Sequence, residues 1–302
     1  MRPFGVAALV AGLVALSSTH ATADEPPPAP PPPYSLPWQL RPAAVATVVR
    51  SDTAVAFYED AAGNGSTVAT TLLGSYKLTP WLAPLVRLGF VSNAPGGDGS
   101  GVSLVNPVLG ATGLWPLGSD LRLTGFLGFA IPVGMGGGNS PDADARSAAG
   151  SGILARSAMD NAMFAVNYFT VFPGIDLAFV KGGFTAQLEV TVLELLRVRG
   201  EEVDADEART NFTAGLHLGY FVIPQVSLGA ELRYQRWLST PVFVEADSKK
   251  RDTLTLAVGP RFHIKLSDTM WIRPGVAYAR GMDDPMSGQD YNVVQVDLPV
   301  SF

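Results

Sequence analysis

The chain has 302 residues, no cysteine and a formal net charge of −6. The acidic balance argues against nucleic acid as a partner, and the missing cysteines exclude disulfide scaffolds, thiolate metal sites, cysteine nucleophiles and a lipidated N-terminal cysteine. Hydrophobic residues make up 47% of the chain, yet beyond residue 23 they form no run of the ~18 apolar residues typical of a spanning helix.

The first element is a predicted signal peptide over residues 1–23. Arg2 gives a short positive start, residues 4–16 form an apolar run, and Ala21-Thr22-Ala23 is a small-x-small cleavage site. A membrane anchor is the alternative, but the run is shorter than the ~20 residues that a spanning helix needs. Cleavage would remove only one charge, that of Arg2, and would leave 20 basic and 27 acidic residues, a balance of −7.

Residues 24–42 follow as a proline-rich segment, with prolines at 26–28 and 30–33. Such a sequence favours an extended polyproline conformation and cannot form a core of its own. We therefore expect a stiff periplasmic tether ahead of the folded domain.

Residues 43–302 contain twelve runs that alternate apolar and other residues, which is the period of a β-strand. A membrane protein without long apolar helices must close its strands into a barrel, because backbone groups in lipid have to be paired. The sequence thus predicts an all-β fold: a closed antiparallel transmembrane up-and-down β-barrel of about 12 strands. The expected strands are 43–58, 65–77, 81–92, 102–116, 120–133, 163–180, 184–198, 208–221, 226–240, 252–266, 270–280 and 290–302.

The connections between these runs alternate between tight turns and longer loops, as in bacterial outer-membrane barrels. An even number of strands then leaves both ends of the chain in the periplasm. Three prolines, Pro107, Pro260 and Pro274, fall inside expected strands and each removes a ladder donor, so we expect bulges or shifted strand ends there. The longest loop, 134–162, has room for a short helix; we favour a mobile surface loop over one folded into the barrel.

The last strand ends in "VDLPVSF", with apolar residues at Val294, Val296, Leu298, Val300 and Phe302. In this respect the chain resembles bacterial outer-membrane β-barrel proteins, whose final strand alternates in this way and commonly ends in Phe. Aromatic residues near the strand ends are typical of interfacial girdles. The resemblance implies export to the outer membrane of a Gram-negative bacterium, contact with lipid and lipopolysaccharide, and assembly by the barrel assembly machinery through Phe302. A secreted β-sandwich is the alternative fold.

Alternation also predicts a belt of both charge signs on the inner wall of the C-terminal half. With the simplest hairpin registers, Glu189 faces His217, Glu231 faces Arg261, and Arg273 faces both His263 and Asp297. Such a belt is either a selectivity ring or a set of ion pairs filling a closed interior. The candidates for a lumenal constriction are Glu189, His217, Glu231, Arg233, Arg261, His263, Arg273 and Asp297.

The function that these features favour is a passive, porin-like channel for small solutes. The alternative is a non-conducting structural or surface-binding barrel that acts through its extracellular loops or its proline-rich tether. We expect no enzyme activity, since nothing in the chain matches a catalytic arrangement, and we expect no cofactor. The acidic loop residues lack the spacing of a Ca²⁺ loop, so no metal site is predicted.

Overall fold

The computed structural model describes residues 34–97 and 99–302. The expected signal peptide and residues 24–33 of the expected tether lie outside the described residues. None of the helices in the described part of the chain is long and apolar enough to cross a membrane.

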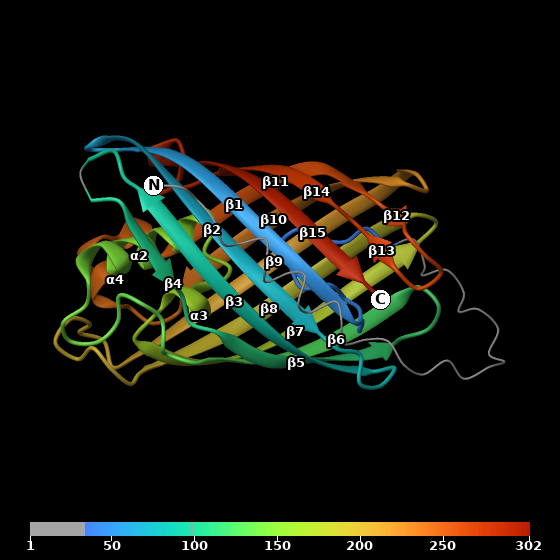
Figure 1. Cartoon of the computed structure of the whole chain (residues 1–302), viewed down its shortest axis with the longest axis horizontal. Helices are drawn as coiled ribbons and strands as arrows, with labels where there is room; N and C mark the ends of the chain where they lie inside the picture. Colours follow the sequence, from blue (N-terminus) through green and yellow to red (C-terminus); the bar gives the residue numbers. More distant parts are fainter. Residues whose placement is uncertain (1–33, 98) are drawn as a thin grey trace. The chain divides into compact units, whose positions relative to one another are not determined.

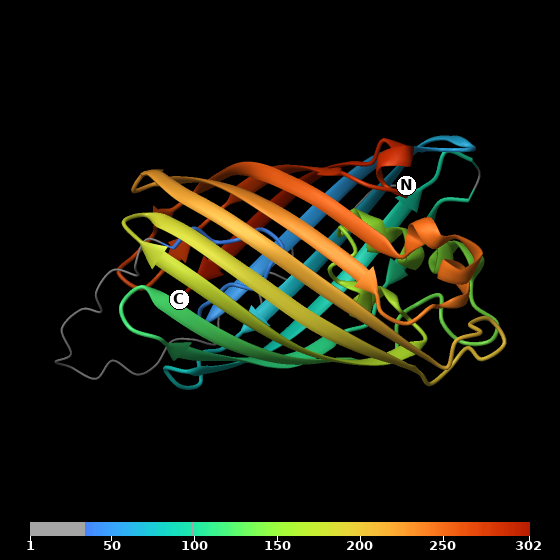
Figure 2. The ribbon, with the colours of Figure 1, turned by 180° about the vertical axis from the view of Figure 1, so that it is seen from behind.

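One antiparallel sheet forms the wall, and it closes on itself because the first strand pairs with the last. Fifteen strand segments make up the sheet, and three wall strands are each interrupted once, which leaves the twelve that the sequence predicts. The strands run obliquely around the barrel (Figures 1 and 2). They are β1 (Val48–Asp60), β2 (Gly63–Ser75), β3 (Leu82–Ala94), β4 (Gly101–Leu104), β5 (Val108–Pro116), β6 (Leu121–Ala130), β7 (Tyr168–Lys181), β8 (Phe184–Arg197), β9 (Ala208–Ile223), β10 (Val226–Trp237), β11 (Asp252–Phe262), β12 (Ile264–Lys265), β13 (Trp271–Ile272), β14 (Gly275–Gly281) and β15 (Asn292–Ser301).

The interruptions fall at or near the prolines that the sequence flags. Pro107 separates β4 from β5, and Pro274 separates β13 from β14. Pro260 stays inside β11, where the pairing with β14 skips from Val258 to Arg261. Because proline has no N–H to donate, each site leaves the ladder locally unpaired.

The two faces of the wall differ as the alternation predicts. Leu216, Leu228 and Leu256 project outward and stay 38%, 52% and 39% exposed, whereas Thr255 and Arg261 point inward and are buried. An apolar surface of this extent is unfavourable in water and stable in lipid, so the outer face is built for a membrane. Of the seven aromatic residues expected near the tight turns, Tyr76, Trp81, Trp115 and Tyr220 are at least half exposed, whereas Phe184, Phe221 and Trp271 are less so.

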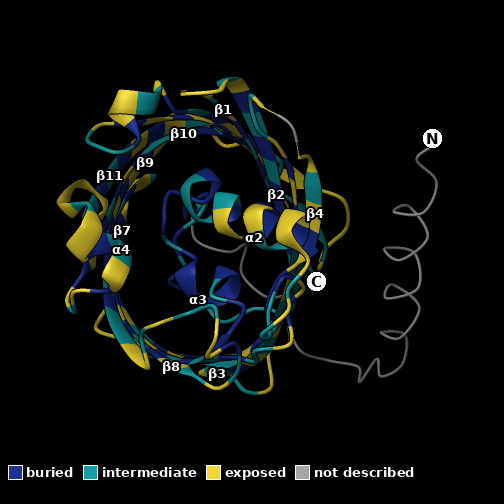
Figure 3. Ribbon diagram, turned by 90° about the vertical axis from the view of Figure 1, so that its left-hand side faces the viewer, coloured by how far each residue is buried: buried dark blue, intermediate teal, exposed yellow. Residues whose placement is uncertain are grey.

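Two segments occupy the interior of the barrel. Residues 34–47 precede β1, and residues 131–167 connect β6 to β7 through α2 (Ala143–Ala155) and α3 (Asn161–Phe164). Figure 3 shows both helices inside the ring of strands. The remaining short helices lie in the long loops: α4 (Val242–Ala246), η2 (Ser248–Lys250) and η3 (Ser287–Gln289).

These two segments correct the sequence-based expectations. The expected tether, 24–42, is not entirely a periplasmic spacer, since Trp38 and Leu40 are each only 1% exposed within the barrel. The loop 134–162 does contain a helix, but it is not a mobile surface loop. Small residues allow α2 to pack against the wall: a Cβ on Gly152 would lie 2.8 Å from the Val91 side chain.

The end of the chain completes the closure. The Phe302 N–H donates to the Thr47 carbonyl at 3.1 Å, one residue beyond the β1–β15 ladder. The Phe302 side chain is 39% exposed and belongs to the outer face. Substitution of Phe302 therefore changes its outward side chain and leaves its backbone hydrogen bond in place.

Replacing Phe302 by Ala should reduce the folded barrel in outer membranes several-fold, while Phe302→Tyr should stay near wild type. The backbone hydrogen bond persists in both variants, so the difference isolates the aromatic side chain. The measurement is heat-modifiable gel mobility of outer-membrane fractions. Refolding in detergent is the control, because loss of one half-buried ring costs only about 1–2 kcal/mol; normal folded levels of Phe302→Ala in cells would contradict the assembly role.

Candidate functional site

The eight candidates from the sequence all lie on the C-terminal half of the wall. Seven are buried, and Arg273 is partly exposed. Six of the side chains meet the inserted N-terminal segment or one another, whereas His263 contacts Ser227 and Arg273 contacts Ser301. The structure therefore brings most of the predicted belt together, but around a segment of the chain itself.

Several expected pairings are wrong. His217 lies opposite Gln187 and Glu231, not Glu189. Glu231 lies opposite Ala257, not Arg261. The reason is that the pairing of β8 and β10 ends at Leu196 and Arg236, two and four residues before the expected strand ends at 198 and 240, and such an error at a long loop shifts the whole register.

Arg273 also differs from the expectation, because it does not contact Asp297. It lies level with Pro299, to whose carbonyl its N–H donates at 2.9 Å, and its Nη1 donates to the Ser301 hydroxyl at 2.7 Å. Asp297 instead lies opposite Gly275. Across the tight turn the expected register is observed, since Ile264 pairs with Ile272, which sets His263 level with Arg273.

The lumenal network is a set of six arginines and six carboxylates that pair within the described residues. Asp297 binds Arg261 at 2.6 Å and Arg50 at 2.7 Å, and Glu231 binds Arg233 at 2.7 Å. Formal charges balance, so burial of each charge is compensated by a partner. The members are Arg41, Arg50, Arg87, Arg156, Arg233, Arg261, Asp52, Asp160, Asp176, Glu189, Glu231 and Asp297.

Sequence reasoning missed seven of these twelve residues. Four of them, Arg50, Asp52, Arg87 and Asp176, lie within strands at positions that alternate with the outward-facing residues. Alternation could have found them. The other three could not be predicted from strand alternation. Arg41 lies in the N-terminal segment, and Arg156 and Asp160 lie in the loop, both of which were expected outside the barrel.

The wall holds the N-terminal segment mainly through its backbone. Arg261 donates to the carbonyls of Leu36 and Pro37 at 3.1 and 3.2 Å, and the His217 ring lies 3.0 Å from the Ser35 carbonyl.

Carboxylates of the wall accept from the backbone N–H groups of the same segment. Glu189 accepts from Arg41 at 2.6 Å, and Glu231 accepts from Trp38 and, at 3.2 Å, from Gln39. The predicted belt thus satisfies donors and acceptors that would otherwise be buried unpaired.

Inward-facing glycines make room for the same segment. A Cβ added at Gly215 would collide with the Leu40 side chain, and one at Gly219 would collide with Ser35. A Cβ at Gly229 would lie 3.0 Å from the Trp38 ring. The wall is therefore shaped to accept these side chains at close range.

The loop segment is fixed from the opposite end. Asn106, at the break between β4 and β5, donates to the Ala165 carbonyl at 2.9 Å and accepts from Gly134 N–H at 3.0 Å. Arg146 of α2 pairs with Asp204 of the next long loop at 3.1 Å. The α2–α3 segment is anchored on both sides of its entry into the lumen.

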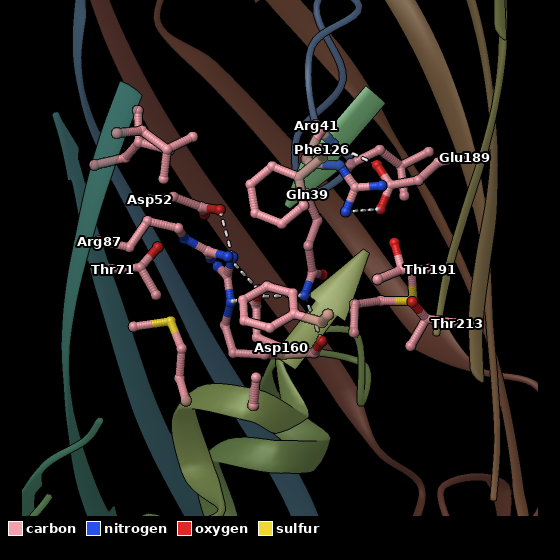
Figure 4. A pocket seen from close by; sticks show the side chains of 18 of the residues that line it. Gln39, Arg41, Asp52, Thr71, Arg87, Phe126, Asp160, Glu189, Thr191 and Thr213 are labelled. Atoms are coloured by element: carbon pink, nitrogen blue, oxygen red, sulfur yellow. Dashed lines mark hydrogen bonds and ion pairs between the residues drawn. The ribbon is translucent and has the colours of Figure 1, made fainter. Parts of the chain in front are cut away.

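The two inserted segments meet near the middle of the barrel. The Gln39 side chain donates to the Arg156 carbonyl and, at 3.4 Å, to Asp160. Beside this contact is a cavity with about 70 Å³ of room for the centres of water-sized molecules. In Figure 4, Asp52 and Arg87 lie on one side of it, and Arg41 and Glu189 lie on the other.

Among residues 34–97 and 99–302, no group of three or more His, Cys, Asp or Glu side chains is arranged to hold a metal ion. The carboxylates of the lumen face arginines or backbone N–H groups. The chemistry of this site is therefore recognition of charge and of hydrogen-bonding groups.

No family model matches the sequence, and no curated protein sequence matches it. Solved structures are similar in fold. An outer-membrane channel from Pseudomonas putida F1 superimposes with a TM-score of 0.53 at 14% identity, over 88% of this chain and 98% of that one. The KdgM porin in complex with disordered oligogalacturonate gives 0.48 at 11% identity over 84% and 99%, and the NanC porin gives 0.48 at 7% over 83% and 98%.

Gly215→Leu should expel the N-terminal segment, because the new side chain takes the space of Leu40. Burial of Trp38 and Leu40 stabilises the N-terminal segment inside the barrel by about 3–6 kcal/mol. Loss of this burial should strongly favour release of the segment from the lumen. Chymotrypsin cleavage after Trp38 in the refolded protein measures release. The control is Gly74→Leu, because a Cβ added at Gly74 would meet only the Val86 side chain, at 3.6 Å. Equal protection of Trp38 from cleavage in both variants would contradict the binding of the N-terminal segment against Gly215.

Proposed function

We propose that this chain is a passive outer-membrane channel for small solutes, closed in the described state by its own residues 34–47 and opened when they leave the lumen. The observation that carries this proposal is that the wall charges bind a chain segment that precedes the first wall strand and is not itself a strand of the sheet. Moving residues 34–45 out of the lumen breaks no hydrogen bond between wall strands, and the bond from Phe302 to Thr47 stays in place. The similarity of the barrel in fold to a solved outer-membrane channel supports this proposal at the level of the fold.

The buried charges support a lumen that is hydrated in another state. Replacing buried ion pairs by packed apolar residues is often neutral or stabilising, so a permanently sealed barrel has no energetic need of them. Glu231, Arg261 and Glu189 lose their backbone partners when the segment leaves. Water and solute then take those hydrogen bonds, and a ring of both charge signs filters by size and charge.

The second candidate is a non-conducting barrel that acts through its loops or its N-terminal segment. A specific observation favours it: the interior is occupied from both ends, and the carboxylates of the lumenal network are all paired within the described residues. The two candidates differ in one physical property, namely whether residues 34–47 leave the lumen on a functional timescale.

The same proposal includes the cellular setting. Export by the signal peptide and insertion by the barrel assembly machinery bring the protein into the outer membrane, where lipid and lipopolysaccharide contact its apolar outer face. The exposed leucines and aromatic residues of that face support this setting. We further propose that the protein has no enzymatic activity and needs no cofactor.

A disulfide lock tests the mechanism, since the chain has no cysteine of its own. The hydroxyls of Ser35 and Ser227 lie 3.4 Å apart, which joins the N-terminal segment to β10. The double variant Ser35→Cys, Ser227→Cys should be silent in a planar bilayer when oxidised and should conduct at the wild-type level when reduced. Single-channel conductance of the refolded mature protein is the measurement.

The matched control joins two wall strands on the outer face. Thr53 and Thr70 have hydroxyls 2.9 Å apart, and Thr53→Cys, Thr70→Cys should conduct in both redox states. Wild-type protein that is folded yet silent would favour the non-conducting candidate. Conductance that survives the oxidised Ser35–Ser227 lock would show that solute passes without movement of the segment.

A further inference from the structure

The cavity at the meeting point of the two inserted segments combines polar and apolar walls. The volume available to the centres of water-sized molecules is about 70 Å³. This volume is several times the ~10–15 Å³ that one water molecule needs by the same measure. The cavity is lined by both inserted segments and by strands from opposite sides of the barrel. It therefore lies on the path that a solute would take through the lumen.

Three buried polar atoms of the cavity lining, Arg156 Nη1, Arg41 Nε and the Thr191 hydroxyl, make no hydrogen bond among the described residues. Arg156 is 1% exposed and pairs with Asp52 and Asp160, yet its Nη1 makes no hydrogen bond among the described residues. A buried guanidinium N–H without an acceptor is costly. An acceptor in the cavity, either water or a ligand oxygen, satisfies it.

The charges that line the cavity favour an anion. Arg41, Arg50, Arg87 and Arg156 oppose three carboxylates, Asp52, Asp160 and Glu189, so the lining carries one excess positive charge. The balance of the whole network is restored by carboxylates that do not line the cavity. An anionic oxygen at Arg156 Nη1 would accept the charge-assisted hydrogen bond that this group lacks.

The apolar side is built for a hydrocarbon body. Phe126 and Phe172 lie with ring centroids 5.4 Å apart, and Leu73, Leu85 and Met163 line the cavity with them. Pockets with a mostly apolar wall and a few polar groups orient small amphiphilic ligands. A fully hydrated inorganic anion would gain nothing from this wall.

We propose that this cavity is a binding site for a small organic anion, with a carboxylate on Arg156 Nη1 and an apolar body of single-ring size against Phe126, Phe172 and Leu85. The proposal rests on the proposed channel function, of which it names the solute class. Arg156 comes from the loop and Leu85 from β3, so the site exists only while the α2–α3 segment is inserted.

Four probes of graded chemistry test this, by ligand-observed NMR titration of the refolded mature protein. Benzoate should bind saturably. Benzyl alcohol, which lacks the charge, and acetate, which lacks the body, should each bind at least roughly ten-fold more weakly, as loss of a charged hydrogen bond or of apolar burial implies. Benzylamine should not bind. Equal binding of benzoate and benzyl alcohol, or no saturable benzoate binding by folded protein, overturns the proposal.

Two variants localise the site. Arg156→Lys keeps the charge but removes Nη1, so benzoate affinity should fall roughly ten-fold while benzyl alcohol affinity is unchanged. Leu85→Ala should weaken benzoate and benzyl alcohol alike, and the outward Leu228→Ala should change neither. Unchanged benzoate affinity in both Arg156→Lys and Leu85→Ala would place the ligand elsewhere.

Repeating the titration on the oxidised Ser35→Cys, Ser227→Cys variant separates this proposal from the channel mechanism. Benzoate binding at wild-type affinity in the locked protein supports the site even if conductance proves insensitive to the lock. Absence of binding in a protein whose conductance does respond to the lock overturns the site and leaves the channel mechanism standing.

Discussion

The constraint on which the structure depends is that every backbone N–H and C=O within the lipid must be paired by the wall itself. Pairing of β1 with β15 meets it by removing both sheet edges. Closure then fixes where each side chain goes: apolar residues face lipid, and the strand residues of the lumenal network face inward, whereas charges near strand ends, such as Arg236 and Arg280, stay exposed. The interior consequently collects more charge than a wall of this circumference can pair by itself, and the inserted segments supply the remaining partners.

Those segments and the wall are matched in kind. Arginines and carboxylates of the wall are satisfied by main-chain groups of residues 35–41, whereas the loop segment contributes charged side chains of its own, Arg156 and Asp160. The first arrangement is a set of neutral partners for charged wall groups, and the second is a set of ion pairs. Because residues 34–47 contribute few charges, their departure removes only one charge, that of Arg41, from the lumenal network.

The sequence predicted the parts of this structure that follow from local periodicity: the twelve strands, the inward and outward faces, and the breaks near three prolines. It failed where a decision depended on three-dimensional packing. Trp38 and Leu40 follow a proline-rich run, which in the sequence is typical of a tether. Only the structure shows that Gly215 and Gly219 of the wall leave space for the side chains of this segment. The registers failed at long loops, since α4 shortens β10 in a way that alternation cannot reveal. The candidate belt was therefore correct in its location and wrong in most of its partners.

Recognition through the main chain has a consequence for which substitutions the segment tolerates. A wall that binds the carbonyls of Ser35, Leu36 and Pro37 places little demand on the identity of those side chains. Substitutions at Leu36 and Pro37 therefore leave these hydrogen bonds in place, whereas Gln39 and Arg41, which act through their side chains, are constrained in identity.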